Sequence, residues 1–316
     1  MADKLQFVPV ALDSLRPNTA LEFDLYLRSD PRQPVVLFRE QNYPLEERDV
    51  RSLSESGIDS LYISAQQAES FERYVRETVI GDETIPVSDR YKILRDVSRA
   101  SFLGAFNSDC PDRMVEQAQS LAGELVELIC DDDLIVADLF RVMQHDYCTY
   151  THLTNVCAYG TALAAAVGIA DRTALAAIAA GALLHDIGKR KVPQVILNKP
   201  GTLTAEETKI VRRHPQDGFD ELARRGDLGW GQLMMVYQHH ERPDGRGYPV
   251  GIELDEIHPW AQICTVVDVF DALTCHRPYR RPMPAREALA YLERNAGRQF
   301  NPELVQCWIE AMSRRS

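Results

Sequence analysis

The sequence predicts a mainly α-helical protein, in which a helical bundle follows a small α+β unit. Stretches that are typical of strands lie within residues 1–85, whereas from Ser88 onward apolar residues recur at the spacing of helices. Histidines and aspartates recur between His152 and Asp268, on these helices or directly after them. Together these observations favour a helical bundle that holds polar side chains in its interior.

Residues 1–85 are predicted to form the α+β unit. Four short segments favour strands, and in the second of them Phe23, Leu25 and Leu27 alternate onto one face. The predicted strands are residues 6–12, 22–28, 34–38 and 60–63, and the predicted helices are residues 45–56, which Gly57 ends, and 65–79. We interpret this unit as a regulatory or interaction domain, although simple structural packing explains the same pattern.

Residues 86–135 are predicted to be a helical connector and a candidate contact in a homodimer. Residues 88–106 favour one helix, and Pro111 stands where a first helical turn tolerates proline. The second helix, residues 111–130, places one apolar stripe along a single face, formed by Met114, Ala118, Leu121, Leu125 and Leu128.

Residues 136–316 are predicted to be helical throughout and to carry the chemistry. Thr204 and Glu207 form a capping box for a helix that would continue through His214 and tolerate Pro215 as a kink. The predicted helices are residues 149–167, 173–188, 204–215 and beyond, 229–241, 259–274, 284–296 and 302–312.

Composition excludes several classes of protein. A net charge of −12 argues against general nucleic-acid binding, which needs a basic surface. The longest apolar run, residues 174–184, is shorter than the ~20 residues that cross a bilayer. Seven cysteines without a CxxC pair, together with a start that lacks a secretory signal, favour a reducing cytoplasm. We therefore expect a cytoplasmic protein that binds neither membranes nor nucleic acid.

Seven polar side chains follow one another in an order typical of metal binding. They are His152, His185, Asp186, His214, His239, His240 and Asp268. Imidazoles and carboxylates bind iron, manganese and zinc, and seven ligands are too many for one ion but suit two ions that share a carboxylate. The set predicts a metal-dependent hydrolase. The remaining histidines, His145, His258 and His276, are interpreted as structural.

Positive charge gathers beside these residues in an otherwise acidic chain. Lys189, Arg190 and Lys191 follow the His185-Asp186 doublet, and residues 277–298 hold six arginines against two glutamates. A solvated face would explain much of this charge, but its position suits a small substrate that carries phosphate.

Three motifs resemble those of the HD-GYP domain, a subgroup of the HD superfamily of metal-dependent phosphohydrolases. They are HDIGK from His185, HHERPDGRGYP from His239 and DVFDALTCHRPYR from Asp268. The resemblance covers residues 136–316 and implies a phosphodiesterase that acts on the bacterial second messenger cyclic di-GMP, giving linear pGpG or GMP. It also implies that the seven histidines and aspartates are the metal ligands.

By this resemblance, one ion takes His152, His185 and Asp268, and the other takes His214, His239 and His240. Asp186 is the natural bridge because a carboxylate has two oxygens, whereas an imidazole offers one lone pair. We expect iron or manganese as the two divalent ions.

The resemblance also implies which residues contact the substrate. Lys189 is expected to reach the phosphate and assist catalysis with Asp186, while Arg277 and Arg280 grip the phosphate or a guanine edge. Tyr279 is expected to stack on a base. Tyr248, in the Gly247-Tyr248-Pro249 loop, is expected to contact the substrate or a protein partner, with a structural turn as the alternative.

One position departs from some members of the family, and two further functions stay open. Cys148 stands where those members have a glutamate that completes a third metal site, so two ions are favoured over three. The alternatives are an HD phosphohydrolase for another cyclic dinucleotide or nucleotide, and a non-catalytic receptor for cyclic di-GMP. The receptor is the weakest of the three, because all seven predicted ligands are present.

Overall fold

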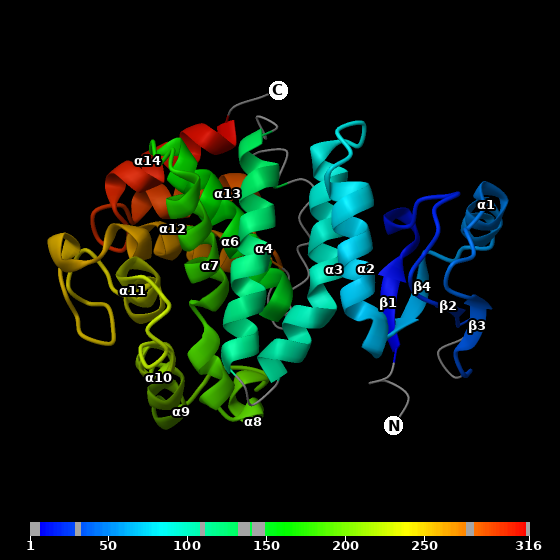
Figure 1. Cartoon of the computed structure of the whole chain (residues 1–316). Helices are drawn as coiled ribbons and strands as arrows, with labels where there is room; N and C mark the ends of the chain where they lie inside the picture. Colours follow the sequence, from blue (N-terminus) through cyan, green and yellow to red (C-terminus); the bar gives the residue numbers. More distant parts are fainter. Residues whose placement is uncertain are drawn as a thin grey trace. The chain divides into compact units, whose positions relative to one another are not determined.

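The computed structural model describes residues 7–28, 33–107, 111–131, 140, 149–275 and 281–313 (Figure 1). The chain divides into two compact units, one that ends at Gly104 and one that begins at Ala105. The described residues include no helix that is both long and apolar enough to cross a membrane.

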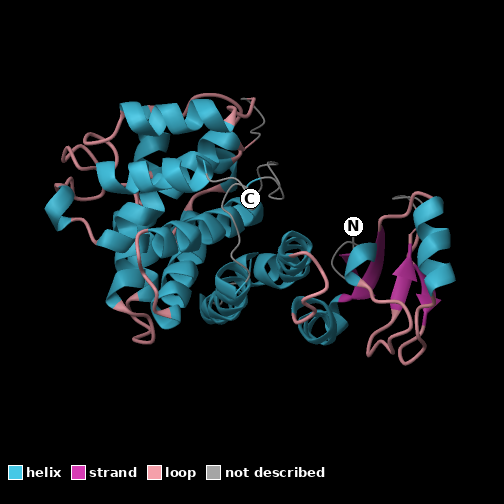
Figure 2. Cartoon of the chain, turned by 90° about the horizontal axis from the view of Figure 1, so that it is seen from above, coloured by secondary structure: helices cyan, strands magenta, loops and turns pink. Residues whose placement is uncertain are grey.

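The N-terminal unit is built on a four-stranded sheet, which Figure 2 shows with its strands side by side. The strands β1 (Phe7–Ala11), β4 (Ser60–Ser64), β2 (Leu25–Leu27) and β3 (Val36–Arg39) follow in that order, and each neighbouring pair is antiparallel. The helices of the unit are α1 (Glu47–Glu55), α2 (Ala68–Val75) and α3 (Val87–Asn107) as far as Gly104, with η2 (Leu12–Ser14), η3 (Ala65–Gln67) and the π-helical η4 (Arg76–Ile80). All four predicted strands and both predicted helices are confirmed, and the second strand is shorter than predicted.

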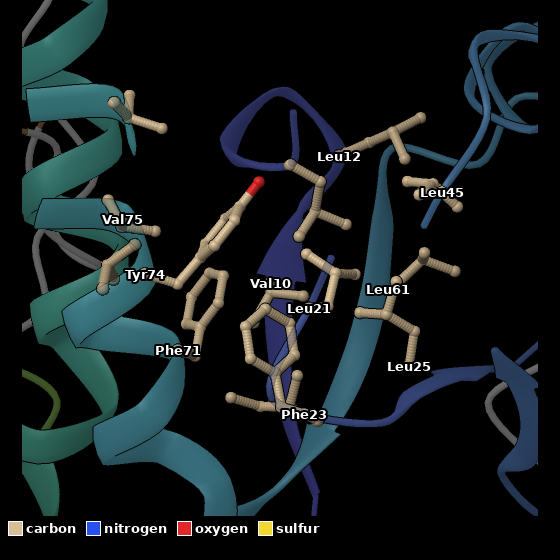
Figure 3. Close-up of a cluster of buried hydrophobic side chains, with 14 of the residues drawn as sticks. Val10, Leu12, Leu21, Phe23, Leu25, Leu45, Leu61, Phe71, Tyr74 and Val75 are labelled. Carbon is tan, nitrogen blue, oxygen red and sulfur yellow. The ribbon is translucent and has the colours of Figure 1, made fainter. Parts of the chain in front are cut away.

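The core of this unit is apolar, as Figure 3 shows. Phe71 and Tyr74 of α2 point toward the sheet, and the ring of Phe71 meets that of Phe23 edge to face, with 5.3 Å between their centroids. Val10 and Leu61 pair across β1 and β4 and are both buried. Removal of these side chains from water stabilises the unit.

The second unit is helical, and α7 (Arg172–Leu184) lies at its centre, packed against α4, α6 and α11. Helix α12 packs on α6 and α11. The other helices are α4 (Pro111–Asp131), α6 (Thr149–Ala166), α8 (Gln194–Leu197), α9 (Ala205–Val211), α10 (His214–Leu222), α11 (Trp230–Gln238), α12 (Pro259–Thr274), α13 (Ala285–Arg294), α14 (Pro302–Ser313), η5 (Ile187–Lys191) and η6 (Leu254–Glu256). The predicted apolar stripe of α4 is buried.

Three predicted helix boundaries were wrong, all beside predicted site residues. Helix α7 ends before His185, and α11 ends before His239. The helix capped by Thr204 ends at Val211, and a new helix starts at His214, with Pro215 in its first turn. Proline is tolerated there because its missing N–H has no partner in that turn. His185, His214 and His239 therefore lie where helices start or end.

Candidate metal centre

The fold brings all seven predicted ligands together inside the helical unit. Their ligand atoms form two groups, in each of which all the atoms lie within 4.8 Å of one another. We call His152, His185 and Asp268 group one, and Asp186, His214, His239 and His240 group two. His152 comes from α6 and Asp268 from α12, whereas the other five come from the starts or ends of α7, α10 and α11.

The Asp186 carboxylate lies between the two groups. Its Oδ1 is 3.2 Å from Nε2 of His214 and 3.7 Å from Nε2 of His239. Its Oδ2 is 3.4 Å from Nε2 of His185 and 3.7 Å from Nε2 of His152. Each oxygen of one carboxylate thus faces imidazoles of a different group.

Backbone carbonyls at helix ends orient three of the imidazoles. Nδ1 of His185 lies 2.6 Å from the carbonyl oxygen of Ala182, and Nδ1 of His214 lies 2.7 Å from that of Val211. Nδ1 of His239 lies 3.0 Å from the carbonyl oxygen of Val236. A carbonyl only accepts, so each Nδ1–H donates and each Nε2 keeps its lone pair toward the centre. The last turn of a helix leaves such carbonyls without intrahelical partners.

His152 is oriented by a carboxylate that the sequence analysis did not single out. Nδ1 of His152 lies 2.8 Å from Oδ2 of Asp271, whose Oδ1 accepts a hydrogen bond of 2.8 Å from Asn155. Asp271 is fully buried, one helical turn after Asp268 on α12. The spacing of two aspartates three residues apart in the DVFD sequence is the signal that could have found it.

Electrostatics keep the cluster in the protonation state that metal binding needs. Burial raises the pKa of the Asp186 carboxyl, but Lys189 and the surrounding imidazoles outweigh it, so the pKa lies well below its usual range. Burial also raises the pKa of Asp268, and His152 reverses this and lowers it overall. Burial lowers the pKa of His239 to about 4, and burial followed by the neighbouring His239 lowers that of His240. Ionised Asp186 and Asp268 and neutral His239 and His240 are therefore favoured near neutral pH.

Within the part of the chain that the structure describes, two buried atoms of the cluster lack the hydrogen-bond partners that buried polar groups normally have. Among the described residues, neither Oδ1 of Asp186 nor Nε2 of His185 takes part in a hydrogen bond. Such groups are costly to bury unless something else satisfies them. A divalent cation would satisfy both, and the donor set of imidazole nitrogens and carboxylate oxygens suits it.

Gly188 of the HDIGK motif lets two segments of the centre approach closely. A Cβ on Gly188 would lie 2.0 Å from the carbonyl oxygen of His214 and 2.7 Å from the amide nitrogen of Gly218. Both obstacles are backbone atoms, which cannot move aside as a flexible side chain can. A side chain at position 188 would therefore displace η5, which carries Lys189, from α10, which starts at His214.

The loop after His240 is fixed by Glu241, a second residue whose role the sequence analysis missed. The buried Glu241 carboxylate accepts hydrogen bonds from the backbone amides of Val250, Gly251 and Ile252, at 2.7 to 3.3 Å. A Cβ on Gly247 would lie 2.4 Å from Cα of Glu241, so the loop needs glycine there for close contact. Gly245 serves a different purpose in the same loop: its φ is 68°, a backbone conformation that favours glycine.

Tyr248 contacts the second group from this loop. Its ring stacks on that of His240, with 4.6 Å between centroids and 25° between planes. Burial raises the pKa of the Tyr248 hydroxyl, and Asp186 and Asp268 raise it further, so the phenol stays neutral.

The other predicted site residues divide into those that the structure places and those outside the described residues. Lys189 pairs with Oδ2 of Asp186. His258 caps α12 by accepting a hydrogen bond from the amide of Trp260, which confirms its structural role. The positions outside the described residues are His145, Cys148, His276, Arg277, Tyr279 and Arg280.

Fold and site together define a class: a helical-bundle protein with a buried cluster of imidazoles and carboxylates suited to divalent metals. Residues 133–304 match the model of the HD domain family. The chain belongs to this family, and its motifs place it among the HD-GYP proteins.

Known proteins with similar sequences or folds agree with this placement. A cyclic di-GMP phosphodiesterase of Pseudomonas aeruginosa is 33% identical over 280 residues, which is 84% of this chain and 67% of the relative. A 3′3′-cGAMP-specific phosphodiesterase of Vibrio cholerae is 38% identical over 174 residues, covering 52% of this chain and 35% of the relative. The solved structure of Bd1817, an HDG"Y"P protein of Bdellovibrio bacteriovorus, superposes with a TM-score of 0.70 at 20% identity. That alignment covers 98% of this chain and 100% of Bd1817, and it shows a shared fold.

Proposed function

We propose that this chain is a metal-dependent phosphodiesterase that hydrolyses cyclic di-GMP to pGpG, GMP or both. The position of Asp186 is the observation that carries the proposal, because its two oxygens face two different groups of imidazoles. A carboxylate in this position can bridge two ions, and a pair of ions is a common device for phosphodiester hydrolysis.

We assign one ion to group one and the other to group two, with Asp186 shared. Iron or manganese is the preferred identity, since the donor set is rich in imidazole and carboxylate and the groups include no thiolate. Divalent ions held there would supply a nucleophile from water at neutral pH and offset the negative charge of the phosphate.

Hydrolysis requires a water oxygen to attack phosphorus while the bond from phosphorus to the ribose O3′ breaks and a proton ends on O3′. The Lys189 ammonium lies against Asp186 and its side chain is 25% exposed, so it can reach a phosphate oxygen beside the two groups. There it would stabilise negative charge that grows in the transition state. Substrate contacts by Tyr248, Arg277, Tyr279 and Arg280 stay predictions.

The relatives support a cyclic dinucleotide as the substrate. The Pseudomonas aeruginosa relative, named as a cyclic di-GMP phosphodiesterase, aligns along most of this chain. The Vibrio cholerae relative, named as specific for 3′3′-cGAMP, makes that dinucleotide the second candidate substrate.

Activity with defined substrates and metals tests the proposal. The full chain is purified without oxygen, its metals are quantified, and products from cyclic di-GMP and from 3′3′-cGAMP are separated by chromatography. We expect pGpG or GMP from cyclic di-GMP, loss of activity after chelation, and recovery with iron or manganese. If the metal-loaded protein leaves cyclic di-GMP intact but cleaves 3′3′-cGAMP, the second candidate replaces the first. Binding of cyclic di-GMP without cleavage would identify a receptor instead.

Three finer features of this proposal stay predictions from the sequence. They are the cytoplasmic location, the homodimer, and protein partners that bind the N-terminal unit or the Gly247-Tyr248-Pro249 loop. None of them is needed for the proposed hydrolysis.

A further inference from the structure

Arg212 stands next to the proposed active site in a position that neither metal binding nor the known motifs explain. It lies directly after α9, two residues before His214, and its side chain is exposed. Its guanidinium carbon is 4.9 Å from the centroid of the Tyr248 ring. The same ring stacks on His240, so a single aromatic ring links Arg212 to group two.

A pocket of about 190 Å³ opens at this place. Its lining includes Arg212, Arg246, Tyr248 and the ligands His239 and His240. The pocket thus combines cationic side chains with two proposed metal ligands, a combination suited to a substrate that carries more than one negative charge.

Among the described residues, the guanidinium of Arg212 has no ionic partner. Another arginine of the pocket, Arg242, is held by Asp244 through hydrogen bonds of 3.0 and 2.6 Å. Within the described part of the chain, no carboxylate forms such a pair with Arg212. Its planar fork of donors remains available to an anion.

We propose that Arg212 is a substrate-binding residue that holds the second, non-reacting phosphate of the cyclic dinucleotide. This inference rests on the proposed function, in which the first phosphate is held beside Asp186 and Lys189. Both phosphates of a cyclic dinucleotide belong to one small ring, so the second phosphate cannot lie far from the first. The pocket that joins His240 to Arg212 is where it fits.

The contact with Tyr248 explains why an exposed arginine would be effective here. The cation–π contact with the ring restricts the positions of the guanidinium before substrate arrives, which lowers the entropic cost of binding. A non-reacting phosphate has the same charge in the ground state and in the transition state. Arg212 would therefore contribute to KM more than to kcat.

The test compares Arg212→Ala with Arg213→Ala, which removes the same charge one residue further on. Arg213 is a suitable control because its side chain is 74% exposed and lies near Asp217, at 3.4 Å. Rates are measured with cyclic di-GMP and with bis(p-nitrophenyl) phosphate, a diester with a single phosphate, and metal content is measured for each protein.

For Arg212→Ala we expect KM for cyclic di-GMP to rise by about ten- to hundred-fold, the range of a charge-assisted hydrogen bond. Its kcat, its metal content and its rate with bis(p-nitrophenyl) phosphate stay at the parent values, as do all the values for Arg213→Ala. Arg212→Lys keeps the charge without the planar fork and recovers part of the affinity.

Two results would overturn the inference. Unchanged KM in Arg212→Ala would show that the second phosphate lies elsewhere. Equal losses with both substrates, or loss of metal, would show that Arg212 only supports Tyr248 and His240. Failure of the proposed function looks different, because the parent protein itself would then leave cyclic di-GMP intact.

Discussion

The two ligand groups differ in how they are enclosed. In group one all three side chains are buried, and the protein orients His152 through a second buried carboxylate, Asp271. Group two borders the pocket, its His240 is partly exposed, and Tyr248 stacks on that imidazole. Group one thus takes His152 and Asp268 from within the helices α6 and α12 and His185 from the end of α7, whereas all of group two lies at helix ends, and part of it faces the place where substrate would enter.

This difference indicates that the two groups on either side of the Asp186 carboxylate have different roles. Group one is the closed group: buried hydrogen bonds hold its side chains, and its chief role would be to fix its ion. Group two is the open group. It lies beside Lys189 and the arginines of the pocket, so its surroundings would also bind and orient the substrate. Changes in the closed group should therefore affect metal affinity, and changes around the open group should affect turnover or KM.

The largest effect is expected from Gly188→Ala, which would push η5, directly after Asp186, away from the start of α10 at His214. The new Cβ would lie 2.0 Å from the carbonyl oxygen of His214, so backbone must shift. We expect a loss of about 3 kcal/mol in the free energy of unfolding, measured by urea denaturation. Gly160→Ala is the matched control, because its Cβ would meet only Val267 at 3.8 Å and Ala182 at 3.9 Å. If Gly188→Ala unfolds at the same urea concentration as the parent, η5 and α10 do not approach each other as closely as described.

The second-largest effect is expected from Asp271→Ala, which should lower the metal affinity of group one but not that of group two. Asp271→Ala removes the acceptor that orients His152, so the ion of group one should bind ~10–100-fold more weakly, as other orienting residues of metal ligands do. The ion of group two should stay. Metal titration would then show one tight and one weakened site per chain, and Asp271→Asn, which keeps an acceptor oxygen, should restore part of the affinity. Parental affinity at both sites would contradict the role of Asp271.

Lys189→Ala tests the open side of the centre. Both metals should remain, while kcat for cyclic di-GMP should fall about ten- to hundred-fold, because the lysine would meet the charge that grows on the reacting phosphate. Lys191→Ala is the control on the same short helix, η5, since Lys191 pairs with Glu221 at 3.2 Å instead of Asp186. Equal kcat values in the two variants would remove Lys189 from catalysis.

The smallest effect concerns Cys148. We expect Cys148→Ser to keep the metal stoichiometry and turnover of the parent, because two groups of ligands suffice for two ions. Loss of one metal equivalent in this variant would instead indicate a third site that includes the thiolate.

Sequence patterns predicted the fold well, and they brought the right residues into consideration. Helix α12 begins at Pro259 and ends at Thr274 as predicted, because apolar periodicity and the leading proline mark both its face and its start. The predicted helix boundaries were wrong at His185, His214 and His239. There each imidazole forms a hydrogen bond with a backbone carbonyl in the last turn of the preceding helix. Such bonds compete locally with the helix and leave no periodic signal.

The residues that support the site were harder to predict than the ligands. Asp271, Glu241 and Arg212 act through partners that are far away in the sequence or are backbone groups, as with His152, which is 119 residues from Asp271. Only the tertiary structure brings those partners together. The motifs contain Glu241 and Asp271, but they do not show which groups these carboxylates bind, because those contacts depend on tertiary packing.

Metal content of Asp186→Ala tests the central claim most directly. Asp186 would be the shared ligand of both groups, since Oδ1 faces His214 and Oδ2 faces His185. The parent should hold about two ions per chain after anaerobic purification, and Asp186→Ala should lose both together. His214→Ala, which removes a ligand of group two alone, should mainly weaken one. An Asp186→Ala protein that still holds about one tightly bound ion per chain would contradict the bridging position of this carboxylate.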